Sequence, residues 1–144
     1  MDPIDWPSIA DVLSKIAIAY VLALPVAWDR EQKGRSAGLR TFPLVATAAT
    51  AFLMLARTEF GESAEAQARV LEGLITGIGF IGGGAILKEG GNVHGTSTAA
   101  SIWATAAIGA ATAYEHYEIA IVLSVMMFAT LRILTRFKSD TSAA

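Results

Sequence analysis

The chain has no cysteine and only two histidines among its 144 residues. Without cysteine it has no disulfide, no thiolate nucleophile and no cysteine metal site. The histidines, His94 and His116, lie far apart in the sequence, so a zinc site would need carboxylates as further ligands. No hydrolytic triad, no phosphate-binding glycine loop and no metal-ligand pair at helical spacing is present. We therefore expect a protein that is not an enzyme, with no catalytic residue and no resident cofactor.

Charged residues are also scarce, at 17% of the chain, whereas soluble domains carry about 25%. The net charge of −2 gives no basic surface for nucleic acid. Hydrophobic residues make up 53% of the chain, and the mean hydropathy is +0.49. The first residues are acidic, whereas a secretory signal peptide needs a basic leader, so we expect the first apolar segment to remain as an anchor.

What the chain has instead is an apolar stretch rich in glycine. Residues 73–87 are uncharged and include six glycines. In water each glycine inside a helix costs about 1 kcal/mol relative to alanine. In a bilayer no water competes for the backbone, and glycine lets neighbouring helices approach closely. The stretch therefore predicts a glycine-rich membrane helix.

Four more apolar stretches accompany this one, and together they predict an all-α membrane bundle in a single transmembrane domain over residues 1–138. The predicted segments are residues 9–28, 41–56, 73–87, 96–114 and 119–135, followed by a tail over 139–144. A spanning helix needs about 20 residues, and the third segment is short. It either begins earlier, near Ala68, or is broken within the membrane. The polar residues 57–72 are predicted to form an outer loop with a short surface helix.

The basic residues predict the orientation. With five spans, eight of them fall on one side: Arg30, Lys33, Arg35, Arg40, Lys88, Arg132, Arg136 and Lys138. Only Lys15, Arg57 and Arg69 fall on the other side. Because cytoplasmic loops carry the excess of basic residues, the N-terminus is predicted outside and the C-terminus in the cytoplasm.

Polar residues cluster where the first segment is predicted to leave the membrane. Asp29, Arg30 and Glu31 follow Pro25, which should free a backbone carbonyl and kink the helix. Two interpretations are open for this cluster. It is a cation site in which Asp29 and Glu31 bind a metal such as magnesium, or it is an ordinary charged helix end.

Two further polar segments fall on the same predicted side. Arg40 is expected to pair with Asp29 or Glu31, and Thr41 is expected to cap the second helix. The alternative is that Arg40 only anchors the helix end on the cytoplasmic side and Thr41 only caps the helix. Between the third and fourth segments, Glu89 and Asn92 flank a predicted tight turn. Three hydroxyl residues then begin the fourth helix, either as caps or as an anion site.

Small residues recur every four positions in the third and fourth segments. We predict that the two helices pack through Gly77, Gly79 and Gly83 on one side and Ser97, Ser101 and Thr105 on the other. A polar path through the bundle is the alternative interpretation of the hydroxyl residues.

An ordered set of motifs resembles one known family. The motifs are Asp29-Arg30-Glu31, Gly38-Leu39-Arg40-Thr41, residues 77–84, Glu89-Gly90, residues 95–103 and residues 106–109. In this order they resemble the MgtC/SapB family of bacterial inner-membrane proteins, over roughly residues 13–134. The family pattern usually has Glu in place of Asp29, and many relatives have His in place of Phe42. Longer relatives carry a cytoplasmic C-terminal regulatory domain that this sequence does not include.

The resemblance implies a role in magnesium homeostasis and, in some pathogens, survival inside phagocytes. It leaves three functions open: adaptation to magnesium limitation, cation transport, and regulation of another membrane complex such as the ATP synthase. The expected partners are the lipid bilayer, a second copy of the chain or that other complex, and not nucleic acid.

Overall fold

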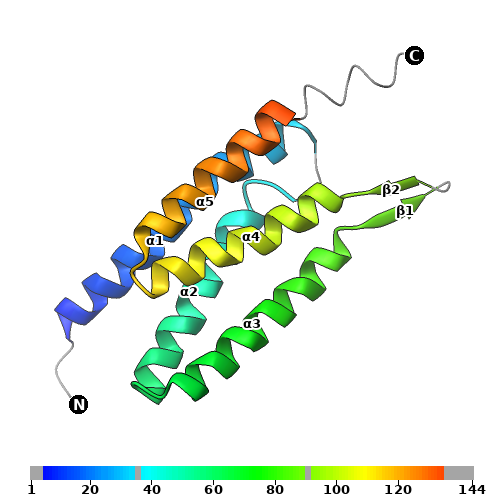
Figure 1. Cartoon of the computed structure of the whole chain (residues 1–144). Helices are drawn as coiled ribbons and strands as arrows, with labels where there is room; N and C mark the ends of the chain where they lie inside the picture. The colour runs from blue at the N-terminus through cyan, green and yellow to red at the C-terminus, as the bar shows by residue number, and fades with distance from the viewer. Residues whose placement is uncertain (1–4, 35–36, 90–91, 135–144) are drawn as a thin grey trace.

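In the computed structural model, the described residues are 5–34, 37–89 and 92–134, and they form five α-helices with one small β-hairpin. Figure 1 shows the helices side by side, with the hairpin projecting from the end of the bundle at which α5 also ends. We call this the hairpin end. The helices are α1 (Trp6–Gln32), α2 (Thr41–Phe60), α3 (Ala64–Gly84), α4 (Thr96–Ala113) and α5 (Tyr117–Ala129). The all-α membrane bundle predicted from the sequence is confirmed, and the hairpin is an addition to it.

Helix α1 begins at a side-chain cap and continues through its proline. The Asp5 carboxylate accepts a hydrogen bond from Ser8 N at 3.4 Å, and prolines are favoured in the turn that follows such a cap. Pro25 lies inside the helix, which extends to Gln32 without a break. The apolar face repeats at helical spacing and includes Ala19, Ala23 and Ala27, all fully buried.

Helix α2 begins at the residue predicted to cap it, so the actual cap lies one residue earlier. Arg40 is the N-cap residue and makes no side-chain capping bond, while Thr41 is the first helical residue. The predicted cap at Thr41 is therefore wrong. The N–H groups of Thr41 and Phe42 both donate to Gly38 O, so the turn before Thr41 leads directly into the helix. Pro43 lies in the first turn, where a missing N–H costs nothing.

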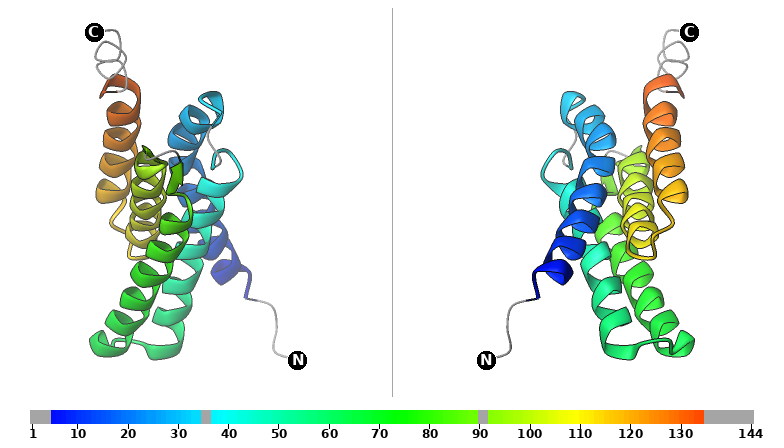
Figure 2. Two further views of the ribbon diagram at one scale, coloured as in Figure 1. Left: turned by 90° about the vertical axis from the view of Figure 1, so that its right-hand side faces the viewer. Right: turned by 90° about the vertical axis from the view of Figure 1, so that its left-hand side faces the viewer.

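Helix α3 is longer than predicted and unbroken. Ser63 caps it by accepting from Ala66 N at 3.4 Å, and the helix continues to Gly84. The predicted outer loop over residues 57–72 is wrong, because its ends belong to α2 and α3 and only a short turn separates them. Figure 2 shows α2 and α3 reaching well past the turn that joins α4 to α5.

The hairpin pairs β1 (Leu87–Glu89) with β2 (Asn92–His94) in an antiparallel register of Leu87 with His94 and Glu89 with Asn92. The predicted tight turn lies outside the described residues except for Asn92. Gly95 follows with φ +86°, and a Cβ there would overlap the Ala85 carbonyl oxygen. Only glycine fits this position, which brings the chain back to the start of α4.

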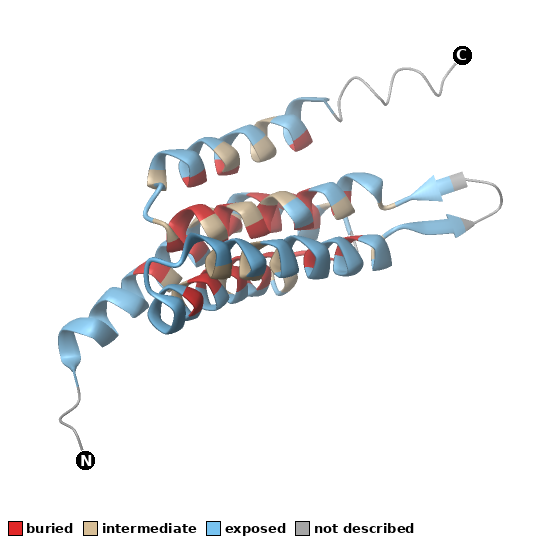
Figure 3. Cartoon of the chain, turned by 60° about the horizontal axis from the view of Figure 1, so that its bottom comes forward, coloured by how far each residue is buried: buried red, intermediate tan, exposed pale blue. Residues whose placement is uncertain are grey.

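Helix α4 lies at the centre of the bundle. It carries ten buried residues, whereas α3 carries two, Ile78 and Gly82. Figure 3 shows this concentration of buried residues on the inner helices. A Cβ on Gly109 would overlap Ala46 O of α2, and Thr50 Oγ1 of α2 lies 3.0 Å from Gly109 O. The backbones of α2 and α4 therefore touch at Gly109.

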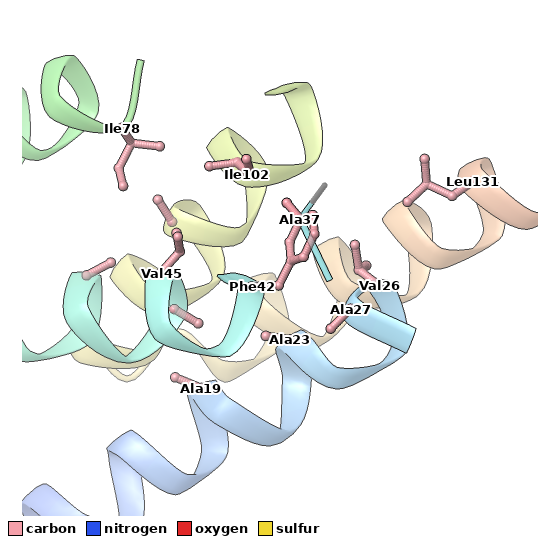
Figure 4. Packing of buried hydrophobic residues seen from close by; sticks show 13 residues of the cluster. Ala19, Ala23, Val26, Ala27, Ala37, Phe42, Val45, Ile78, Ile102 and Leu131 are labelled. Atoms are coloured by element: carbon pink, nitrogen blue, oxygen red, sulfur yellow. The ribbon is translucent and has the colours of Figure 1, made fainter. Parts of the chain in front are cut away.

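The core is made of small aliphatic side chains around one aromatic ring. Figure 4 shows Ala19, Ala23 and Ala27 of α1 in the same cluster as Phe42 and Val45 of α2. Ile78, Ile102 and Leu131 bring α3, α4 and the chain after α5 into the cluster. Alanine faces let the helices approach closely enough for dispersion contacts, which drive association where lipid tails compete for apolar surface.

Among the described residues, three helical stretches are long and apolar enough to cross a membrane, namely Trp6–Gln32, Thr41–Phe60 and Tyr117–Leu134. The last combines α5 with the short π-helix η1 (Thr130–Leu134). Large apolar side chains point outward from the bundle, and Phe80 of α3 is 85% exposed. Such a surface suits a hydrocarbon environment.

Candidate functional site

The last turn of α1 holds a buried carboxylate surrounded by basic side chains. Asp29 is fully buried, and its Oδ2 accepts hydrogen bonds from Arg30 Nη2 at 2.7 Å and from Lys33 Nζ at 3.0 Å. Lys33 Nζ also lies 2.9 Å from Oδ1, and Arg132 Nη1 lies 3.9 Å from it. Within the described ranges Oδ1 accepts no hydrogen bond of good angle. We call Asp29, Arg30, Lys33 and Arg132 the hairpin-end cluster.

Lys33 joins α1 to the π-helix. Its Nζ donates to the Leu131 carbonyl oxygen at 2.8 Å as well as to Asp29. A π-helix replaces i to i+4 bonds by wider ones and commonly marks a functional position in a helix. Here the π-helix presents the Leu131 carbonyl to Lys33 and brings Arg132 near the buried carboxylate of Asp29.

Arg30 joins α1 to α4. It is 2% exposed, and its Nη1 donates to Ser97 Oγ in the first turn of α4 at 3.4 Å. That turn has Gly95 as N-cap and no side-chain capping bond, so the predicted capping by its hydroxyl residues is wrong. An uncapped helix N-terminus carries a partial positive charge, which adds to that of Arg30.

Glu31 has a separate, structural role. Its Oε2 accepts a hydrogen bond from Leu39 N at 3.0 Å, across the loop between α1 and α2. A Cβ on Gly38 would overlap the same oxygen, so glycine at this position makes room for the Glu31 side chain. The carboxylate thus holds the loop that leads into α2.

The structure does not bring the remaining predicted residues into the hairpin-end cluster. Arg40 is exposed, and among the described residues no ion pair joins it to Asp29 or Glu31. Thr41 is half-buried at the start of α2. The side chains of Glu89 and Asn92 lie outside the described residues, although both backbones belong to the hairpin.

The charge balance at Asp29 does not suit a divalent cation. Among the described residues, three cationic side chains surround this one carboxylate. A cation approaching Asp29 would be repelled by Arg30 and Lys33 at short range. In the part of the chain that the structure describes, no group of three or more acidic or histidine side chains is arranged to hold a metal ion.

The predicted contact between α3 and α4 uses other residues than expected. A Cβ added to Gly77, Gly79 or Gly83 would meet nothing within 4 Å, whereas one on Gly82 would lie 3.3 Å from Ala99 O. The helices face each other across a small apolar pocket of about 130 Å³ lined by residues such as Ile78 and Trp103.

The hydroxyl residues of α4 bond within their own helix. Ser101 Oγ donates to Ser97 O at 2.7 Å, and Thr105 Oγ1 donates to Ser101 O at 2.8 Å. Their helix face turns toward α1 and α2, as the Ser97 and Gly109 contacts show. The pairing of Gly77, Gly79 and Gly83 with Ser97, Ser101 and Thr105 is therefore wrong.

A second ion-pair network, absent from the sequence-based prediction, lies at the opposite end. Lys15 Nζ contacts Asp11 at 2.7 Å and Glu115 at 3.0 Å, and Arg57 Nη1 contacts Glu115 at 3.4 Å. Arg57 also donates to Ala113 O at 2.9 Å. Lys15 is 7% exposed despite its charge. The spacing of Asp11 and Lys15 by four residues was the available sequence signal.

Comparisons with known proteins place the sequence in a family. The sequence pattern that defines the MgtC family matches residues 16–139. The chain belongs to the MgtC family. It is 37% identical to "Protein MgtC" of Brucella abortus over 134 residues, which are 91% of this chain and 56% of that protein. It is 34% identical to "Protein MgtC" of Salmonella typhimurium over 122 residues, or 85% of this chain and 50% of that one.

A further relative in the MgtC family is the "Putative magnesium transporter YhiD" of Escherichia coli. It is 32% identical over 130 residues, covering 86% of this chain and 60% of that protein. The chain thus spans between half and three fifths of the length of these relatives. No solved structure matches the chain.

Proposed function

We propose that this chain is a non-enzymatic protein of the bacterial inner membrane that acts in magnesium homeostasis or in adaptation to magnesium limitation. The observation that carries the proposal is the MgtC family match over residues 16–139, which includes every helix from the middle of α1 to η1. The magnesium-related name of one relative supports the same role. The hairpin-end cluster is our candidate for the working part, because Asp29 and Arg30 belong to the motifs that carry the family resemblance.

The orientation belongs to this proposal. We place the hairpin end in the cytoplasm and the N-terminus outside, because Arg30, Lys33, Lys88 and Arg132 all gather at the hairpin end. Basic residues are enriched on the cytoplasmic side of membrane proteins.

Cation transport is the second candidate. Three apolar helices and the printed name of the Escherichia coli relative support it. The charge around Asp29 disfavours a route through that carboxylate, so transport would use another path. Purified protein in liposomes loaded with an indicator for magnesium, sodium or potassium, one ion at a time, separates the candidates. Flux above that of empty liposomes favours transport, and silence toward magnesium, sodium and potassium favours regulation.

Regulation of another membrane complex, or assembly with a second copy, is the third candidate. It is supported by the open face of α3, where an added Cβ on Gly73, Gly77 or Gly83 meets nothing within 4 Å. A groove of about 570 Å³ between α2 and α3 adjoins this face. Exposed glycines let a foreign helix approach closely in a membrane.

The test of the main proposal is growth in low magnesium. In a bacterial strain that lacks its own family member, the wild-type chain should restore growth on limiting magnesium. Asp29→Asn should lose this activity, and Asp29→Glu should keep it because the carboxylate is preserved. Glu62→Gln, an exposed carboxylate in the α2–α3 turn, is the matched control and should behave as wild type.

Membrane abundance is measured for every variant, since Asp29→Asn leaves Arg30 buried without its counter-charge. Breaking such a buried pair costs about 3–5 kcal/mol. An abundant wild-type chain that fails to restore growth would overturn the proposal. Normal growth with Asp29→Asn would show that the hairpin-end cluster is not the working part of the protein.

A further inference from the structure

A groove runs along the outside of the bundle between α4 and α5. It has a volume of about 290 Å³. Its walls are Ala100 and Ala104 of α4 facing Leu123, Met126 and Met127 of α5. The small side chains of α4 leave the space, and the flexible methionines adapt to what fills it. From Ser97 to Ala104 the groove is about 10 Å long by helical rise.

One end of this groove meets the hairpin-end cluster. Ser97 and Leu131 line the groove, and the same two residues accept hydrogen bonds from the cluster, Ser97 Oγ from Arg30 and Leu131 O from Lys33. The groove therefore has an apolar body and a cationic mouth. The mouth also includes the uncapped N-terminus of α4, whose partial charge is positive.

Among the described residues, two arginines at the mouth share one carboxylate. Asp29 is the one carboxylate that the described residues place in contact with Arg30, Lys33 and Arg132. Arg30 is buried and bonded to Asp29 and Ser97, so it adds positive charge to the mouth but offers no accessible donor. Arg132 is 52% exposed and reaches Asp29 only at 3.9 Å, so its guanidinium is available to a further anion.

We propose that this groove is a binding site for one anionic phospholipid, with its phosphate headgroup at Arg132 and the start of α4 and one acyl chain between α4 and α5. The buried Arg30 adds positive charge close to the headgroup without contacting it. Charge complementarity selects the headgroup, and the apolar walls select the chain. The cluster lies where α1, α4 and η1 all reach the hairpin end, which is the depth at which headgroups meet a bundle of membrane helices. The site does not depend on any role in magnesium homeostasis.

The test measures lipid binding to the purified full-length chain by native mass spectrometry in detergent. Phosphatidylglycerol and phosphatidylethanolamine with identical acyl chains are compared. We expect preferential binding of phosphatidylglycerol. Arg132→Gln should weaken it about fivefold, the effect of one cationic side chain near an anionic surface. Ala104→Phe fills the groove and should abolish the preference. Ala100→Leu is a milder version that serves if Ala104→Phe does not fold.

Two control variants make the same chemical changes elsewhere. Lys88→Gln removes an exposed cation of the hairpin, and Ala48→Phe adds a ring to the exposed face of α2. Both should bind phosphatidylglycerol as wild type does. Equal binding of the two lipids, or unchanged binding in Arg132→Gln and the groove variants, would overturn the proposal. Displacement of phosphatidylglycerol by millimolar inorganic phosphate, with no effect of Ala104→Phe, would instead identify a free-anion site.

Discussion

Glu115 is the one non-glycine residue with positive φ in the described ranges, at +65°. This left-handed conformation is unfavourable for a residue with a Cβ, so neighbouring contacts must stabilise it. Glu115 lies in the turn between α4 and α5, and its carboxylate contacts Lys15 of α1 and Arg57 of α2. A single side chain therefore ties three parts of the bundle together at the end opposite the hairpin.

We predict that this contact gives the protein an acid-sensitive component of stability. The hydrogen bond from Lys15 lowers the pKa of the Glu115 carboxyl below its ordinary value of 4.5. Because the folded state holds the carboxylate more tightly, the stabilisation is fully present above about pH 4.5 and is lost as the pH falls through the lowered value. Glu115→Gln should melt below wild type at pH 7, and the difference should vanish toward pH 3.

The comparison is made by thermal melting in detergent at a series of pH values. Glu65→Gln, a change at an exposed carboxylate paired within α3, is the control and should melt as wild type at every pH. If the difference in melting temperature between wild type and Glu115→Gln stayed constant with pH, the carboxylate charge would not be responsible for the stabilisation.

At the scale of the helices, glycine has two different roles. Gly109 of α4 lies against Ala46 O and Ala49 Cβ of α2, whereas Gly83 of α3 faces open space. The first allows two helices of one chain to touch. The second leaves a bare backbone surface on the outside of the bundle.

This difference predicts opposite results for the same substitution. Gly109→Ala should destabilise the protein by about 1–3 kcal/mol, because the added methyl group collides with backbone that cannot move aside easily. Gly83→Ala should leave stability unchanged or raise it, since alanine is the better helix former. Thermal melting of both variants in the same detergent checks this. If Gly109→Ala melted as wild type, the α2–α4 contact would be wrong.

The sequence predicted the number and type of the main elements because their signals are local. Apolar runs, Pro43 in a first turn and the glycines near residue 95 each constrain their own neighbourhood. Helix α3 was misjudged because its first half is polar and resembles a loop. In the structure the polar first half is helical, is capped by Ser63 and continues without a break into the apolar second half.

The site was predicted only in part, because only some of its residues carry a local signal in the sequence. Asp29 and Arg30 were identified because a charged pair beside an apolar helix is conspicuous. Lys33 and Arg132 were counted only as basic residues, since nothing local shows that a π-helix brings Arg132 to α1 across 103 positions of sequence. The predicted contact between α3 and α4 was wrong because a spacing of four residues identifies a helix face but does not show which neighbouring helix that face meets.

At the scale of the whole molecule, the two ends differ in charge, and this predicts a fixed orientation. The hairpin end gathers Arg30, Lys33, Lys88 and Arg132, so it should remain in the cytoplasm. A reporter that works only in the cytoplasm should be active when fused after Ala144, and a reporter that works only outside should be inactive there. The reverse result would place the hairpin-end cluster on the outer side and remove the orientation argument.

The positions of the two ion-pair networks along α1 also say something about the surrounding bilayer. Lys15 and Asp29 are 14 residues apart, which corresponds to about 21 Å of helix, whereas a typical hydrocarbon core is about 30 Å thick. The apolar belt between them is thus shorter than the lipid it must match. Lipid tails next to α1 have to shorten or tilt, and the cost is a fraction of a kcal/mol per ångström of mismatch. The protein should therefore partition into the thinner regions of a membrane and favour lipids with short acyl chains.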